Sequence, residues 1–440
     1  MAEEGIALAE SVSNPPCGTM FSVPVPQHCP SARELDDLEL LTHGVFGVDG
    51  FEGPGGLVTL SVPPAVADAA RDTGALELVD PEGLPLARVT LASTYDAGQG
   101  DVGIAGPVTS LRHHEFGAFR ALHLSPPQVR DKHRPDTLTV PVTAPLGESD
   151  LTLIRDQEAP VVLLALMGAG TPDGLSAVGL LRATLAAAGH LGDALVVAVP
   201  LATVGERAMD ESRRARVLAA YAPGRVLDLP GRDEQPDDLP DDVAAAVAHD
   251  RPPRAAQGLV LFFTGLSGSG KSTLARALHD VVLEGGTRTV TSLDGDVVRR
   301  NLSAGLTFSR EDRETNIRRI GWVAAEISRH GGVAICSPIA PFDSTRKQVR
   351  AMVEDSGGAF VLVHVATPLE ECERRDRKGM YAKARRGEIP EFTGISSPYE
   401  EPADAAVRVD TTGRSIEDAL GDVLDHLQTH GYLPSREGAR

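Results

Sequence analysis

The sequence of 440 residues predicts an α/β protein whose C-terminal part contains a parallel sheet with flanking helices. In this part, apolar strand-like runs alternate with helical segments, which is typical of parallel strands joined by crossover helices. Two other patterns precede it: a β-rich stretch of short apolar runs broken by Gly, Pro and Asp, and a short α/β segment. The expected C-terminal strands are 258–264, 288–293, 332–337, 360–366 and 406–410.

These patterns divide the chain into five segments. Residues 1–30, rich in Pro and Ser, are expected to form a flexible tail. Residues 31–132 contain β-rich runs such as "GGLVTLSVP", and residues 133–229 contain strands such as "APVVLLALMG" followed by the helical "LSAVGLLRATLAAAG". Residues 230–257 are dense in Pro and Asp and are expected to be an interdomain linker, so residues 258–440 form the C-terminal domain.

The composition excludes several classes of partner. A formal net charge of −20 repels polyanions, so neither a nucleic-acid nor a membrane partner is expected. The 4 cysteines form no C-x-x-C pair, which argues against a disulfide framework or a zinc site. The start of the chain, "MAEEGIALAESVSN", is acidic and lacks a long apolar run, so we expect a cytoplasmic protein without a signal peptide.

A phosphate-binding loop follows the first C-terminal strand. The sequence "GLSGSGKS" matches G-x-x-x-x-G-K-[ST], follows the apolar strand "GLVLFF" and runs into the helical "STLARALHDVV". In this context backbone N–H groups converge on phosphate oxygens, Lys271 reaches the β- and γ-phosphates, and the Ser272 hydroxyl can bind Mg²⁺. We therefore expect a nucleoside triphosphate and Mg²⁺ here. The expected nucleotide-binding residues are Gly265, Leu266, Ser267, Gly268, Ser269, Gly270, Lys271, Ser272 and Thr273.

Polar residues after the second strand are candidates for the acceptor side. Asp294 and Asp296 lie at the carboxyl end of a parallel strand, where a carboxylate can hold Mg²⁺ or accept the proton of an attacking hydroxyl. A plain turn is the more common interpretation of D-G-D. The later stretch "REDRETNIRRIGWVAAEISRHGG" predicts a helix capped by Ser309, with Arg313 and Asn316 on one face. A solvated charged face is the alternative.

The C-terminal domain resembles adenylylsulfate kinase, which phosphorylates the 3′-hydroxyl of adenosine 5′-phosphosulfate (APS) with ATP. Besides the loop, the resemblance rests on "LDGDVVRRNLSAGLTFSREDRETNIRRIGWVA" and "TPLEECERRDRKGMYAKARRGEIPEFTGISSPYEEP", and it spans about residues 258–435. It implies that Lys271 and Asp296 are catalytic, with Asp296 as the base for the 3′-hydroxyl and, with Ser272, as a magnesium ligand. The APS-binding residues that it implies are Asp294, Arg299, Phe308, Arg313, Asn316, Ile339, Lys378 and Phe392.

The same resemblance assigns a part of the substrate to most of these residues. Arg299, Arg313 and Asn316 would hold the phosphosulfate group, because guanidinium groups suit a mixed anhydride of two acids. Phe308 and Phe392 would stack on the two faces of the adenine. Lys378 lies in "KGMYAKAR", which would belong to a mobile segment that closes over both nucleotides.

One stretch departs from the family pattern. Where the family reads close to "SFISPYRADR", this chain has "SPIAPFDSTR", which places Ala340 at the position of an expected serine. Some family members are described with a phosphoserine intermediate at that serine, and alanine cannot carry one. We therefore expect direct transfer from ATP to the acceptor. The effect of Ala340 and Asp343 on APS affinity or acceptor identity stays open.

The N-terminal part resembles the PUA-like domain of ATP sulfurylase, the enzyme that makes APS. The resemblance rests on "ELDDLELLTHGVFGVDGFEG" and "VGIAGPVTSLRHHEFGAFRALHLSPPQVR". An active sulfurylase continues into roughly "QTRNPLHRAH", whose cationic side chains grip the ATP phosphates. Here "PVTAPLGESD" places Gly147 and Asp150 at the histidine positions and Thr143 at an arginine position. A carboxylate without these cations repels a triphosphate, so residues 133–229 are expected to be a truncated remnant that no longer makes APS.

The leading hypothesis is a single-function kinase of sulfate assimilation that makes 3′-phosphoadenosine 5′-phosphosulfate (PAPS) and ADP. From the resemblance we expect a homo-oligomer, with a homodimer as one option, and association with other sulfate-assimilation enzymes. Two alternatives stay open: a bifunctional sulfurylase and kinase, and a kinase-like regulatory protein that senses nucleotides. The presence of Lys271, Ser272 and Asp296 favours an enzyme over a sensor.

Overall fold

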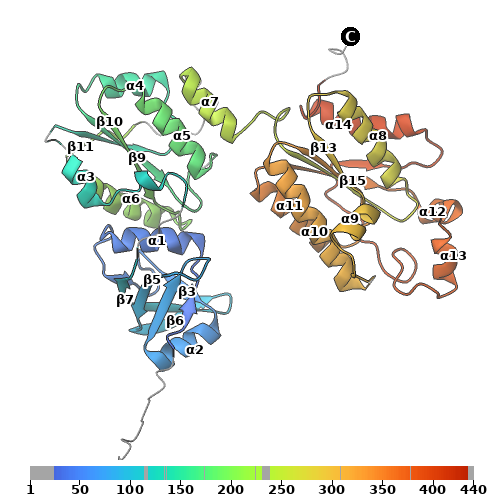
Figure 1. Cartoon of the computed structure of the whole chain (residues 1–440), viewed down its shortest axis with the longest axis horizontal. Coiled ribbons are helices and arrows are strands. Elements are labelled where there is room, and N and C mark those ends of the chain that lie inside the picture. Colours follow the sequence, from blue (N-terminus) through green and yellow to red (C-terminus); the bar gives the residue numbers. More distant parts are fainter. Residues whose placement is uncertain are drawn as a thin grey trace, which may run out of the picture. The chain divides into compact units, whose positions relative to one another are not determined.

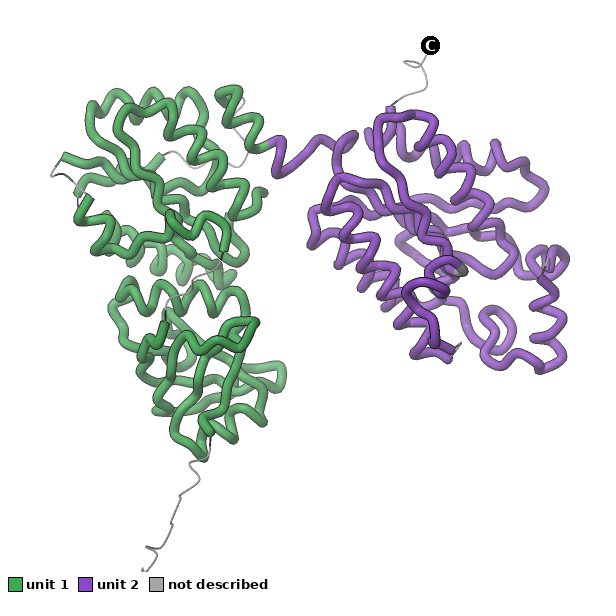
Figure 2. The backbone as a smooth tube through the Cα atoms, in the orientation of Figure 1, with its two compact units in different colours: residues 1–247 green, residues 248–440 purple. Residues whose placement is uncertain are grey.

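The computed structural model of the chain describes two compact units, residues 1–247 and 248–440 (Figure 2). Their boundary falls within helix α7 (Asp241–Asp250), inside the segment expected to be a linker. Much of the expected N-terminal tail lies outside the described residues. No described helix has both the length and the apolar character needed to cross a membrane. The described residues are 24–112, 117–132, 134, 136–172, 174–222, 224–229, 238–307, 309–376 and 378–434.

The first part of the N-terminal unit is a small sheet, which confirms the β-rich pattern of the sequence. Strand β7 is its centre and pairs antiparallel with β2, β3, β5 and β6. Two helices, α1 (Ala32–Thr42) and α2 (Pro64–Thr73), were not expected from the sequence. The strands are β1 (Gln27–His28), β2 (Gly50–Phe51), β3 (Leu60–Val62), β4 (Ala75–Val79), β5 (Pro85–Thr90), β6 (Ser93–Gly98) and β7 (Asp101–Ser110).

The second part of this unit is a four-stranded parallel sheet with the order β10-β9-β8-β11. Its strands are β8 (Leu138–Val142), β9 (Val161–Met167), β10 (Ala194–Pro200) and β11 (Arg225–Val226), and they confirm the predicted α/β pattern. The surrounding helices are α3 (Pro126–Lys132), α4 (Glu148–Arg155), α5 (Ala177–Ala188) and α6 (Arg207–Tyr221), with a 3₁₀ turn at Arg120–Leu122.

A shared core and a buried ion pair join the two parts of the N-terminal unit. Leu40 and Phe46 belong to the same buried cluster as Val197 of β10. Arg213 of α6 pairs with Asp37 of α1, and both side chains are fully buried. Helix α1 therefore fastens the small sheet to the parallel sheet.

The C-terminal unit is a five-stranded parallel sheet with the order β13-β14-β12-β15-β16. The five expected strand positions are confirmed to within about two residues at each end. Alternate side chains of the central strand β12 (Leu259–Thr264) pack on opposite faces of the sheet. Leu261 and Phe263 face the helices α8 (Lys271–Glu284) and α14 (Ile416–Thr429), and Phe262 faces α10 (Arg310–Arg329) and α11 (Asp343–Asp355) (Figure 1). The strands are β12 (Leu259–Thr264), β13 (Val290–Leu293), β14 (Val333–Cys336), β15 (Ala359–Val365) and β16 (Val407–Val409).

Helices of this unit both cover the sheet and approach the carboxyl ends of its strands. Ser309 caps α10 as expected, because its hydroxyl accepts the Asp312 N–H at 3.2 Å. The helices are α8 (Lys271–Glu284), α9 (Gly295–Asn301), α10 (Arg310–Arg329), α11 (Asp343–Asp355), α12 (Leu369–Arg375), α13 (Met380–Arg385) and α14 (Ile416–Thr429).

Candidate active site

The phosphate-binding loop connects β12 to α8 and needs glycine for steric reasons. Gly265 has a φ of 148°, and a Cβ atom there would lie 2.5 Å from the carbonyl oxygen of Val365. Gly270 has a φ of 107° and precedes Lys271, the first residue of α8. The loop therefore presents its backbone at the N-terminus of a helix, where the helix dipole favours anions.

Lys271 is a buried cation inside this loop. The residue is only 7% exposed, and its Nζ donates a hydrogen bond of 2.6 Å to the Leu266 carbonyl oxygen. Burial lowers the pKa of Lys271 from 10.5 to about 8, although charges on Cys372 and Asp294 oppose this shift. Carboxylates therefore compensate little of the positive charge that Lys271 brings into the loop.

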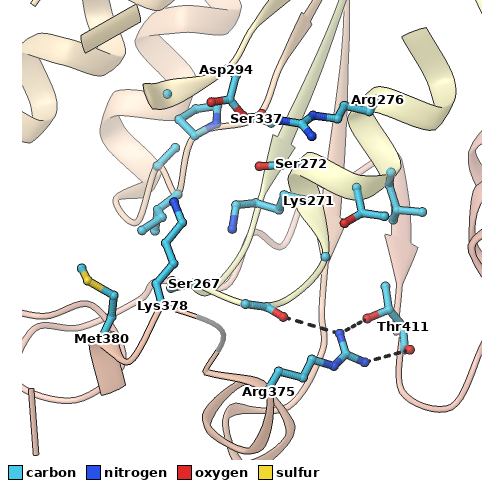
Figure 3. Close-up of a pocket in the computed structure, with 18 of the residues that line it drawn as sticks. Ser267, Lys271, Ser272, Arg276, Asp294, Ser337, Arg375, Lys378, Met380 and Thr411 are labelled. Atoms are coloured by element: carbon cyan, nitrogen blue, oxygen red, sulfur yellow. Dashed lines mark hydrogen bonds between the residues drawn. The ribbon is translucent and has the colours of Figure 1, made fainter. Parts of the chain in front are cut away.

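Residues from three other segments hold the loop backbone in place. The hydroxyls of Thr367 and Thr411 both donate to the Ser269 carbonyl oxygen at 2.9 Å, and the Tyr381 hydroxyl donates to the Ser267 carbonyl oxygen at 2.9 Å. Arg375 in turn donates to the hydroxyl and the carbonyl oxygen of Thr411, at 2.8 and 3.0 Å (Figure 3). These residues were not among those predicted from the sequence, although Thr367 and Thr411 follow predicted strands at their carboxyl ends.

A cavity of about 1380 Å³ extends from this loop to the acceptor-side residues. Figure 3 shows Lys271, Ser272, Asp294 and Lys378 around one shared space. Most of the residues predicted from the sequence line it. They are Ser267, Gly268, Gly270, Lys271, Ser272, Thr273, Asp294, Arg299, Arg313, Asn316, Ile339 and Lys378.

Helix α10 supplies two polar residues to the far half of the cavity. Arg313 donates to the Thr393 hydroxyl at 3.0 Å and to the Glu391 carbonyl oxygen at 3.2 Å. Asn316 is 5% exposed, and its Oδ1 has no hydrogen-bond partner among the described residues. Because buried amide oxygens are normally paired, Asn316 is well suited to a ligand. Arg299 of α9 lines the same half and donates to the Thr307 carbonyl oxygen at 3.2 Å.

Several sequence-predicted residues lie elsewhere. Gly265, Leu266, Ser269 and Phe392 do not line the cavity. Phe392 is 8% exposed and packs edge-on against Tyr381, with ring centroids 5.0 Å apart. Phe308 lies outside the described residues, and so does the side chain of Asp296, whose backbone is part of α9. The adenine contacts of the two phenylalanines and the roles of Asp296 therefore stay predictions.

A phosphate-binding loop between a parallel strand and a helix, beside a large cavity, is typical of P-loop nucleotide-binding proteins, a class that includes kinases. Residues 257–410 match the family model of adenylylsulphate kinase. The C-terminal unit therefore carries an adenylylsulphate kinase domain.

Individual relatives extend this finding. The structure of a hexameric APS kinase from Thiobacillus denitrificans is 27% identical, with a TM-score of 0.73, over 94% of this chain and 95% of that chain. The Mycobacterium tuberculosis APS kinase CysC in complex with AMPPNP and APS is 43% identical over 39% of this chain and 98% of that chain, with a TM-score of 0.38.

Curated relatives carry a different name. A sulfate adenylyltransferase of Emericella nidulans is 48% identical over 192 residues, which is 44% of this chain and 33% of that protein. The chain thus spans about a third of the length of the curated relatives it matches. Together, the two kinds of relative connect the chain with sulfate assimilation.

Proposed function

We propose that the C-terminal unit transfers the γ-phosphoryl group of ATP to the 3′-hydroxyl of APS and releases PAPS and ADP. The single observation that carries this proposal is the continuity of the cavity, which joins Lys271 to Arg313 and Asn316. In-line transfer between two nucleotides requires both in one space, and catalysis then comes from positioning and charge neutralisation. Purified protein with ATP, Mg²⁺ and APS should form ADP and PAPS in equal amounts. Folded protein without PAPS formation would favour the nucleotide-sensor alternative.

The half of the cavity next to the phosphate-binding loop would bind the triphosphate of ATP. The loop N–H groups bind phosphate oxygens, and Lys271 Nζ exchanges the Leu266 carbonyl oxygen for the β- and γ-phosphates. Ser272, Asp294 and, by resemblance, Asp296 offer oxygen atoms that suit Mg²⁺, which supplies charge neutralisation when it is bound. Ser272 and Asp294 line the same cavity, so the donor set fits this ion.

The other half of the cavity, called the acceptor half, would bind the phosphosulfate end of APS. Arg299, Arg313 and Lys378 supply cations, and Asn316 supplies a buried amide. The proton of the 3′-hydroxyl passes to the Asp296 carboxylate as the new O–P bond forms and the bond to ADP breaks. Arg313 also donates hydrogen bonds to Glu391 and Thr393, so it connects the acceptor half of the cavity to residues 391–393.

We also propose direct transfer without a phosphoserine. Ala340 lines the cavity at 1% exposure and has no hydroxyl group to phosphorylate. Incubation with γ-³²P-ATP in the absence of APS should leave the protein unlabelled after denaturation. Stoichiometric acid-stable label on a serine would contradict direct transfer.

The N-terminal unit, we propose, does not make APS. Gly147 and Asp150, at the two positions expected to hold histidines, are used locally: the Gly147 N–H donates to Asp150 Oδ2 at 3.0 Å at the start of α4. Asp150 is 4% exposed, so its carboxylate serves as a helix cap. Protein given APS and pyrophosphate should form no ATP. Formation of ATP would instead establish the bifunctional alternative.

A homo-oligomer is the proposed assembly. The similar Thiobacillus denitrificans protein is hexameric, and the likeness covers 94% of this chain. Light scattering coupled to size-exclusion chromatography should give a mass that is a multiple of the 46.3 kDa chain, and a monomer at micromolar concentration would contradict the proposal.

A further inference from the structure

The loop from β14 to α11 contains a residue in an unfavourable backbone conformation. Ala340 has a φ of 45°, in the left-handed region that residues with a Cβ atom rarely adopt. The residue is buried and lies on the cavity wall together with Ser337, Pro338, Ile339 and Pro341. Contacts from outside this loop must therefore hold the conformation.

Arg346 supplies such contacts from α11 without lining the cavity itself. Its side chain is 2% exposed, its Nη1 donates to the Ala340 carbonyl oxygen at 2.8 Å, and its Nη2 donates to the Glu400 carbonyl oxygen at 2.8 Å. The Glu400 N–H donates to the Pro341 carbonyl oxygen at 2.9 Å. The guanidinium and the Glu400 backbone thus fasten two consecutive carbonyl groups of the loop.

The charge of Arg346 is poorly compensated for such a buried group. Its ion-pair partner among the described residues is Asp343, at 3.4 Å, whose side chain is 36% exposed. Its Nε has no hydrogen-bond partner in the described part of the chain. Burial of a cation with one distant carboxylate costs stability, so stability alone is a weak reason for this arginine.

Thr264 of β12 helps Arg346 to hold this conformation, because its hydroxyl also lies 3.2 Å from the Ala340 carbonyl oxygen. The Ile339 carbonyl oxygen accepts the Thr264 hydroxyl at 2.6 Å, which fixes the orientation of the peptide between Ile339 and Ala340. This peptide is trans, so the Ala340 N–H points away from Thr264. No described residue accepts this N–H. A buried N–H without a partner on a cavity wall suits an anionic oxygen.

We propose that Arg346 is a positioning residue for the acceptor nucleotide: it fixes Ala340 in the left-handed conformation and keeps the Ala340 N–H available to an anionic oxygen of the acceptor. This inference rests on the proposed function, in which the acceptor is APS. Arg346 does not line the cavity, so its effect is confined to the geometry of the acceptor wall.

The test compares two arginines on the same helix. Arg346→Met should raise KM for APS about tenfold or more and leave KM for ATP within about twofold. Arg346→Lys, which cannot bridge both carbonyl oxygens, should lie between the wild type and Arg346→Met. The matched control is Arg350→Met, one turn further along α11, where the arginine pairs with Asp404 at 2.8 Å outside the cavity. This control should match the wild type in both KM values.

A rescue variant separates positioning from general stability. Glycine adopts a positive φ without support, so Ala340→Gly placed in the Arg346→Met background should recover part of the lost APS affinity. If Arg346→Met fails to fold, Arg346→Lys with and without Ala340→Gly carries the same comparison. A lowered melting temperature with unchanged KM for APS, or equal changes in both KM values without rescue, would overturn the positioning role. A wild type that makes no PAPS would overturn the proposed function and this inference together.

Discussion

The hydroxyl group of Tyr381 donates a hydrogen bond of 2.9 Å to the carbonyl oxygen of Ser267, which ties helix α13 to the phosphate-binding loop. The same tyrosine ring packs edge-on against Phe392. Helix α13, which contributes Met380 and Tyr381 to the cavity wall, is therefore linked to the phosphate-binding loop through one side chain.

Tyr381→Phe should weaken ATP binding without disturbing the fold. The substitution removes the hydroxyl and keeps the ring against Phe392, so KM for ATP should rise about three- to tenfold while the melting temperature stays close to that of the wild type. Steady-state kinetics at saturating APS measure this change. Tyr432→Phe, at a tyrosine beside Arg254 outside the cavity, is the control. If Tyr381→Phe and Tyr432→Phe had the same KM for ATP, the hydrogen bond from Tyr381 to Ser267 would have no role in ATP binding.

ATP affinity should fall as the pH rises above about 8. Only protonated Lys271 attracts the phosphates, and burial brings the pKa of this lysine to about 8 in the free protein. Affinity is therefore fully present below pH 8 and declines about tenfold per pH unit above it, until the pKa of the bound state is reached. Calorimetric titration with a non-hydrolysable ATP analogue from pH 7 to 9.5 measures the decline. In Lys271→Met the same range should give a flat, weak affinity.

Lys271→Met should also stabilise the nucleotide-free protein while abolishing turnover. Burial of the charged amine costs folding free energy below pH 8, so the variant should gain up to about 3 kcal/mol in free energy of unfolding at pH 7. This gain should shrink as the pH rises from 8 toward 10.5, because the native lysine loses its proton before the unfolded one does. Urea unfolding at several pH values measures it. A variant less stable than the wild type would contradict the uncompensated burial of Lys271.

The ion pair between Arg213 and Asp37 should be essential to the N-terminal unit and irrelevant to catalysis. Arg213→Met leaves a fully buried carboxylate without this partner and should destabilise the N-terminal unit by about 3–5 kcal/mol. Turnover measured below the unfolding transition should stay at the wild-type level. Arg207→Met, at an exposed arginine of the same helix, is the control and should change stability little. Loss of turnover in natively folded Arg213→Met would indicate that the N-terminal unit contributes to the reaction.

The sheet of the C-terminal unit was predictable because its central strands β14, β12 and β15 are continuous apolar runs buried on both faces, as in "LVLFF" of β12. The P-loop was equally predictable, since Gly265 and Gly270 adopt positive φ values that favour glycine, and the lysine follows at the fixed spacing of the motif. Helix α1 was not expected, although Ser31 and Glu34 form a capping box that could have indicated it. The contacts of Thr367, Thr411 and Arg346 could not be predicted from the sequence, because each depends on which strand ends the fold brings together.

The most direct test of the central claim is a ³¹P NMR spectrum of the purified protein with ATP, Mg²⁺ and APS. A new 3′-phosphomonoester resonance should grow with the β-phosphate resonance of ADP in a ratio of one to one, and Lys271→Ala should show neither. Inorganic phosphate in place of the phosphomonoester, or an unchanged spectrum from folded protein, would contradict phosphoryl transfer to APS.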